Sequence, residues 1–122
     1  NIIIVSSIQL FTSNPYFESW GHFIKDKRKL VELLKDNINT IKTQNLIFIS
    51  GDVHHSEIIS PNPNYPLEIT SSSLTHSLNK PRPLIRPIAL HIAQTFANKH
   101  RMTNESFTYD NNFGILTIST NK

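Results

Sequence analysis

The sequence predicts an α/β fold with parallel strands at its centre. Residues 2–5 and 46–49 are apolar at every position, which is typical of strands buried on both faces of a sheet. Residues 26–41 place their apolar side chains at near-helical spacing, with charged side chains on the opposite face. A strand, a helix and a strand in this order predict a β-α-β unit with parallel strands, so both strands end at the same edge of the sheet.

The second strand ends in a group of polar side chains. Segment 45–57 reads NLIFISGDVHHSE, with Asp52, His54, His55 and Glu57 directly after the apolar run. Ligands and catalytic groups collect beyond the carboxyl ends of strands in open α/β sheets. In an extended segment, Asp52 and His54 point the same way and can bind one metal together, whereas His55 points to the other side. The spacing alone leaves open an ordinary turn with two surface histidines.

The remainder of the chain alternates between loops and short elements. Segment 71–77 is rich in serine and contains His76; it follows a predicted strand, although serine-rich segments are also typical of flexible linkers. The other expected elements are a proline-rich loop at 61–66, a strand at 67–70, a helix at 87–98 and a hairpin of strands 106–110 and 113–120 that turns at Asn111 and Asn112.

Composition excludes some classes of function. The net charge is only +3, and acidic residues are interleaved with the densest basic group at 25–29, so a solvated helix face is favoured over a nucleic-acid surface. The chain has no cysteine, which excludes disulfides and zinc-thiolate sites. No apolar run is long enough to cross a bilayer. The sequence does not indicate a compartment.

Four motifs occur in a fixed order along the chain. They are FESWGHF at 17–23, SGDVHHSE at 50–57, EITSSSLTHS at 68–77 and NFG at 112–114. Together they resemble the carboxyl-terminal half of the PhoD-like phosphatases, a branch of the calcineurin-like metallophosphoesterases, and the resemblance spans residues 2–118. The chain departs from the family pattern at Ser73, where glycine is usual.

The resemblance implies both a fold and a chemistry. Residues 1–122 would be the carboxyl-terminal part of one PhoD-like domain, within a four-layer α/β/β/α sandwich. The implied activity is metal-dependent hydrolysis of phosphate esters, either monoesters or diesters. Asp52 and His54 would be metal ligands, and His54 and His76 would be catalytic. This donor set suits iron, manganese, calcium or zinc.

A further set of residues is implied to orient these ligands or to contact the substrate. The set consists of Ser7, Gln9, His55 and Glu57. Ser7 and Gln9 follow the first strand, where many calcineurin-like enzymes place a metal-binding histidine. For these two residues, a role limited to hydrogen bonding within the loop remains equally open. His76 would either orient another group or touch the substrate phosphate.

The resemblance also implies that an amino-terminal half, with further metal ligands, is missing from this chain. We therefore expect the isolated chain to expose Ile2, Ile4, Ile47 and Ile49, to aggregate or pack loosely, and to lack phosphatase activity. Two alternatives remain open. One is a non-catalytic binding module derived from a phosphatase half, and the other is a self-contained metal- or phosphate-binding α/β domain.

Overall fold

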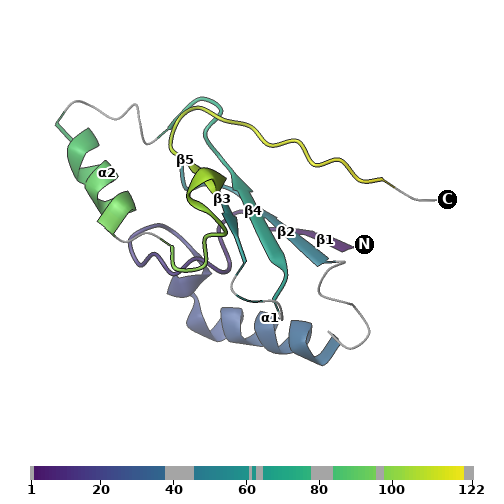
Figure 1. Ribbon diagram of the computed structural model, residues 1–122. Coiled ribbons are helices and arrows are strands. Elements are labelled where there is room, and N and C mark those ends of the chain that lie inside the picture. Colours follow the sequence, from purple (N-terminus) through teal and green to yellow (C-terminus); the bar gives the residue numbers. More distant parts are fainter. Residues whose placement is uncertain are drawn as a thin grey trace.

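A mixed five-stranded sheet forms the centre of the protein (Figure 1). The computed structural model describes residues 2–37, 46–60, 62, 65–77, 84–95 and 98–119. The strands are β1 (Ile2–Val5), β2 (Leu46–Ser50), β3 (Ser56–Ile59), β4 (Leu67–Ser71) and β5 (Phe107–Thr108), and they lie in the order β1-β2-β4-β3-β5. The predicted α/β class is therefore confirmed.

The parallel part of the sheet is the part that the sequence predicts. β1 pairs with β2 in parallel, with Ile2 opposite Leu46, and β2 pairs with β4 in parallel, with Ile49 opposite Ile69. Because parallel strands run in one direction, the carboxyl ends of these three strands lie at one edge of the sheet. The predicted β-α-β unit is confirmed.

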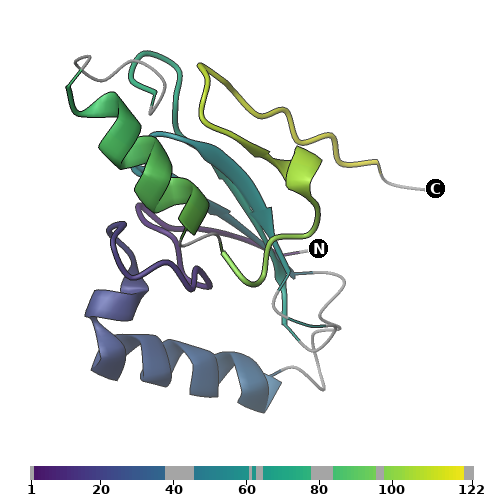
Figure 2. The same cartoon turned by 60° about the vertical axis from the view of Figure 1, so that its left-hand side comes forward.

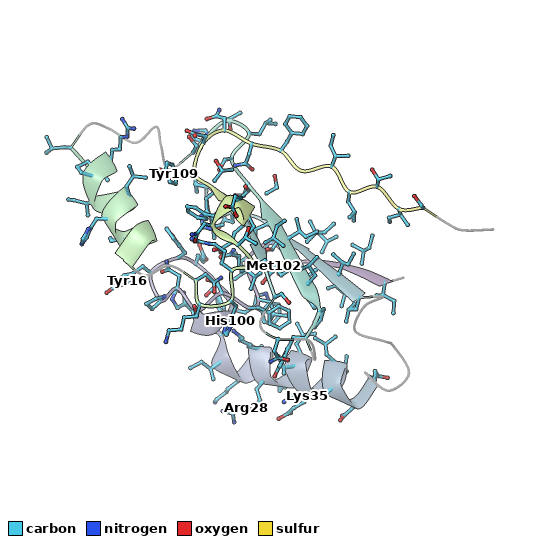
Figure 3. All side chains as sticks on the ribbon, viewed as in Figure 1. Tyr16, Arg28, Lys35, His100, Met102 and Tyr109 are labelled. Atoms are coloured by element: carbon cyan, nitrogen blue, oxygen red, sulfur yellow. The ribbon has the colours of Figure 1, made fainter. Side chains whose placement is uncertain are left out.

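Two helices accompany the sheet, α1 (Ile24–Asn37) and α2 (Arg86–Thr95). α1 packs Leu30 and Leu34 against the core, and Arg28 and Lys35 lie on the side of the helix away from the sheet (Figure 3). The amphipathic pattern is confirmed, although its expected end at residue 41 lies outside the described residues. No helix in the described ranges is long and apolar enough to span a bilayer.

The hydrophobic core lies between α1 and the sheet. Its buried residues include Leu46 and Phe48 from β2 and Leu10 and Phe11 from the loop after β1. The ring of Phe11 meets that of Phe48 edge to face, with 5.4 Å between centroids. The loop that leaves β1 is therefore part of the core, and this packing fixes where the loop runs.

The other face of the sheet is only partly covered by the residues that the structure describes. β1 is an edge strand in which Ile3 is 37% and Val5 76% exposed, so the prediction that it is buried on both faces is wrong here. The register places Ile3 and Val5 on the same face as Ile47 and Ile49. Of the patch expected from Ile2, Ile4, Ile47 and Ile49, Ile2 is exposed as expected, whereas Ile4 packs against the core on the α1 side.

We define the surface formed by Ile3, Val5, Ile47, Ile49 and Ile69 as the open face; its first two residues are exposed and the other three are half-buried. Residues 109–119 run past the sheet on the open-face side, opposite α1 (Figures 1 and 2). Phe113, Ile115 and Ile118 in this segment are themselves more than half exposed. A sheet with one helix-covered face and one apolar open face results.

Two features of the strand pattern differ from expectation. β3 was not predicted, because a run of only Ser56, Glu57, Ile58 and Ile59 gives a weak strand signal. The predicted carboxyl-terminal hairpin is wrong: β5 pairs antiparallel with β3, and residues 109–119 contain no strand. The turn at Asn111 and Asn112 does not join strands but contacts another loop, described below.

The packing generates a test of the core. Phe48 is 1% exposed, so replacing it with alanine in the full-length protein should lower the free energy of unfolding by about 3–5 kcal/mol. Leu33 on α1 is 61% exposed, and Leu33→Ala should change that free energy by less than about 0.5 kcal/mol. Urea denaturation measures both. Equal losses in the two variants would contradict the assignment of the core to the α1 side.

Candidate functional site

Three strand ends meet at one edge of the sheet. The Ser7 carbonyl oxygen lies 3.7 Å from the position that a Cβ on Gly51 would occupy. The His54 backbone N–H donates to Ser72 Oγ at 3.1 Å. The segments that follow β1, β2 and β4 therefore contact one another, and the predicted site residues of all three segments gather at this edge.

Residues 52–55, which we call the DVHH turn, have an unusual backbone. Asp52 has a φ of 71° and His54 a φ of 58°, both in the left-handed region. For a non-glycine residue this conformation costs on the order of 1–3 kcal/mol, although Asp and His adopt it more readily than most. The extended backbone expected from the sequence is therefore wrong here. The side chains nevertheless alternate between exposed and buried, as expected: Asp52 and His54 are exposed, whereas Val53 and His55 are buried.

His76 lies beside His54. The two ring centroids are 6.2 Å apart in an edge-to-face arrangement, and both residues are exposed. His76 Nδ1 lies 2.9 Å from Thr75 Oγ1, which holds the orientation of the ring. Ser73, which replaces the glycine expected at that position, does not have a positive φ, so the serine introduces no backbone strain.

The residues present fit part of a metal site. Among the described ranges, no three His, Asp or Glu side chains gather closely enough to hold an ion. Asp52 and His54 supply one hard oxygen donor and one imidazole, a combination that suits first-row transition metals. Two donors are fewer than the four that a zinc ion takes, so any metal here needs further ligands.

Glu57 forms the centre of a buried polar cluster. Its carboxylate belongs to a residue that is 2% exposed, and it accepts hydrogen bonds from Arg101 Nε at 2.7 Å, Asn98 Nδ2 at 3.1 Å and Gln9 Nε2 at 3.3 Å. His55 Nε2 lies 3.8 Å away, an electrostatic contact longer than a hydrogen bond. Gln9, His55 and Glu57, predicted separately, thus lie together.

The donors around Glu57 decide its protonation state. Burial by itself raises the pKa of a carboxyl group, because it disfavours the charged form. Contacts with His55, Arg101 and Asn98 outweigh burial and hold the pKa of Glu57 below its usual value. Glu57 is therefore a carboxylate at neutral pH and balances the charge of Arg101.

His55 links this cluster to the DVHH turn. Its Nδ1 lies 2.9 Å from the Val53 carbonyl oxygen, a contact that closes the turn when Nδ1 carries the proton. Its ring contacts those of Phe17 and Phe107, with 5.1 Å between the centroids in each pair. Since the residue is only 1% exposed, this packing holds the ring in place. His55 is thus a buried residue that stabilises the turn, not an exposed one that could bind a ligand directly.

Glu68 is a second buried carboxyl group on the same face of the sheet. Its two oxygens accept the backbone N–H groups of Leu10 and Phe11, each at 2.7 Å, so it anchors the loop after β1. Burial raises the pKa of Glu68, and the bonds from Leu10 and Phe11, the Ser50 hydroxyl and the charge of Lys27 only partly oppose it.

The turn at Asn111 and Asn112 contacts the serine-rich segment. The Asn112 backbone N–H donates to the Ser73 carbonyl at 3.1 Å, Ser71 Oγ donates to Asn112 Oδ1 at 3.1 Å, and Asn111 Nδ2 donates to the Leu74 carbonyl at 3.0 Å. These bonds fix the segment that carries His76. A cavity of about 550 Å³ lies next to them, between residues 112–116 and the open face at Ile49 and Ile69.

Three buried or partly buried polar residues near the candidate site were not predicted from the sequence: Glu68, Asn98 and Arg101. Glu68 carries little signal, because a charged residue between Leu67 and Ile69 in a strand is also the pattern of a side chain that faces solvent. Asn98 and Arg101 carry none, since their partner Glu57 lies 41 and 44 residues away. Trp20, from the motif at 17–23, donates its Nε1–H to Ser6 Oγ at 2.9 Å.

Comparisons of this chain with models of known protein families, with curated proteins and with solved structures found no match.

The pKa of Glu57 generates a pH-dependent test. A carboxyl whose folded pKa is lowered stabilises the fold above its unfolded pKa, and this contribution is lost as pH falls through the folded pKa. Glu57→Gln should therefore lower the free energy of unfolding by about 3 kcal/mol at pH 7, because Arg101 loses its partner. The difference from the wild type should shrink below about pH 4.5.

Denaturant titrations of both proteins across that pH range measure this difference. The raised pKa of Glu68 acts with the opposite sign, since its contribution is lost as pH rises, but it is common to both proteins and cancels in the comparison. A difference that stays constant from pH 7 to acid would contradict the lowered pKa of Glu57.

Proposed function

We propose that the chain is the carboxyl-terminal part of a PhoD-like metallophosphoesterase that hydrolyses phosphate esters. The observation that carries this proposal is the meeting of the DVHH turn and the His76 segment at the carboxyl edge of the parallel strands, joined by the bond from the His54 N–H to Ser72 Oγ. This is the position where open α/β sheets bind ligands. It unites the two motifs on which the resemblance to the family chiefly rests.

The side chains at this edge suit distinct tasks. Asp52 and His54, both exposed, are the donors that would hold metal ions. A bound metal would neutralise phosphate charge and lower the pKa of its water. His76, oriented by Thr75 at Nδ1, would touch a phosphate oxygen or the leaving group. Iron, manganese, calcium and zinc remain the candidate metals.

The open face supports the finer proposal of a four-layer sandwich. A sheet in a doubly wound fold is covered by helices on both faces. In a four-layer α/β/β/α sandwich, each sheet has helices on one face and the second sheet on the other. Here α1 covers one face, and Ile47, Ile49 and Ile69 form an apolar opposite face. An upstream half of the domain would cover this face and supply the further metal ligands.

The proposal predicts that Asp52 and His54 are both required for metal binding. Asp52→Ala and His54→Ala in the full-length protein should each lower metal content and phosphatase activity by orders of magnitude, because water does not replace a protein ligand at fixed geometry. Metal analysis and hydrolysis of a generic phosphate ester measure these effects.

Asp36→Ala provides a matched control for these two variants. Asp36 is an exposed carboxylate near the end of α1, so its loss should leave metal content and activity unchanged. Full metal occupancy in both Asp52→Ala and His54→Ala would contradict the ligand assignment.

The open face predicts the behaviour of the isolated chain. Residues 1–122 alone should aggregate or pack loosely, because an uncovered apolar sheet face and an edge strand favour association. They should also show no metal-dependent phosphatase activity. Size-exclusion chromatography, denaturation and an activity assay test this. A monodisperse, cooperatively unfolding monomer without activity would favour a self-contained domain, and an active one would refute the requirement for a missing half.

A further inference from the structure

Two residues that follow α2 contact the buried cluster behind the DVHH turn. Arg101 donates its Nε–H to Glu57 Oε1 at 2.7 Å, and Asn98 donates to Glu57 Oε2 at 3.1 Å. Neither belongs to any of the motifs that suggest phosphatase chemistry.

We propose that Arg101 and Asn98 are positioning residues for the metal-binding DVHH turn and act through Glu57. This inference rests on the proposed function, since it assigns these two residues to the same site.

A continuous series of contacts carries the effect. Arg101 and Asn98 each bind a different oxygen of Glu57, so the carboxylate cannot rotate. Glu57 Oε2 lies 3.8 Å from His55 Nε2, and His55 Nδ1 lies 2.9 Å from the Val53 carbonyl oxygen. That carbonyl belongs to the turn in which Asp52 and His54 have positive φ. A backbone of this kind persists only where its surroundings hold it.

Aromatic packing makes the arrangement stiff. The Arg101 guanidinium lies 4.0 Å from the centroid of Phe107, and that ring is 5.1 Å from the His55 ring. The Phe107 ring therefore limits where the Arg101 guanidinium can lie and keeps it against the Glu57 carboxylate. Asn98 also joins the loop after β1 to the cluster, since its Oδ1 accepts a hydrogen bond from Ser13 Oγ at 3.0 Å.

The segment around residue 100 provides a matched control. Lys99 is an exposed cation two residues before Arg101, and only its backbone N–H is bonded, to Ser13 Oγ. Lys99→Met thus removes a charge from the same segment without touching Glu57. Arg101→Met removes the cation together with its bond to Glu57.

The experiment measures the affinity of the full-length protein for Mn²⁺ by titration, together with the midpoint of thermal unfolding. Arg101→Met and Asn98→Ala should each weaken Mn²⁺ binding by about 10- to 100-fold, as is usual when a group that orients a metal ligand is lost. Lys99→Met should bind like the wild type. A purely structural role would lower the unfolding midpoint and leave the affinity of the folded protein unchanged, which would overturn the inference.

A double-mutant cycle tests whether Arg101 acts through Glu57. If it does, Arg101→Met combined with Glu57→Gln should weaken Mn²⁺ binding no more than Glu57→Gln alone. Additive losses would overturn that route. If Arg101→Met does not fold, Arg101→Lys keeps the charge without the Nε–H geometry, and an affinity equal to that of the wild type for both Arg101→Lys and Asn98→Ala would overturn the inference.

The outcomes separate this inference from the proposed function. Mn²⁺ binding by the wild type that is lost in His54→Ala but unchanged in Arg101→Met would leave the proposed function standing and overturn the inference alone. A wild type that does not bind Mn²⁺ or another of the candidate metals would overturn both.

Discussion

The carboxylate of Glu57 is the interaction on which the rest of the site depends. A buried charge is costly unless donors surround it, and here the donors come from two distant parts of the chain: Gln9 after β1, and Asn98 and Arg101 after α2. Satisfying one carboxylate thereby fixes the loop after β1 and the segment after α2 against β3. The DVHH turn, which immediately precedes β3, is then held through His55.

The cluster also explains why a polar interior occurs on the covered face of the sheet. Glu57 on β3 and Glu68 and Thr70 on β4 lie on the α1 side together with Phe48, because the register aligns them. Near α1 this face is apolar, whereas toward the carboxyl edge it becomes polar. The apolar part supplies stability, and the polar part determines where the loops run. The candidate site residues Asp52, His54 and His76 lie exposed just beyond it.

The predictable parts of this protein are those with local signals. The β-α-β unit and the meeting of strand ends follow from periodicity, which depends on neighbouring residues only. The face that each strand buries does not follow: a continuous apolar run such as residues 2–5 shows that both faces are apolar, not that this chain covers both. β3 and its bond to Arg101 were missed because Glu57 in a short strand is stabilised by residues more than 40 positions away.

The central claim is that the DVHH turn binds metal at the carboxyl edge of the sheet. The most direct measurement is anomalous X-ray diffraction from crystals of the full-length protein grown with Mn²⁺. The account predicts an anomalous peak that marks a metal ion bound to both the Asp52 carboxylate and the His54 imidazole, at about 2.0–2.3 Å from each. Occupied metal peaks elsewhere in the protein, with both of these side chains free of metal, would contradict it.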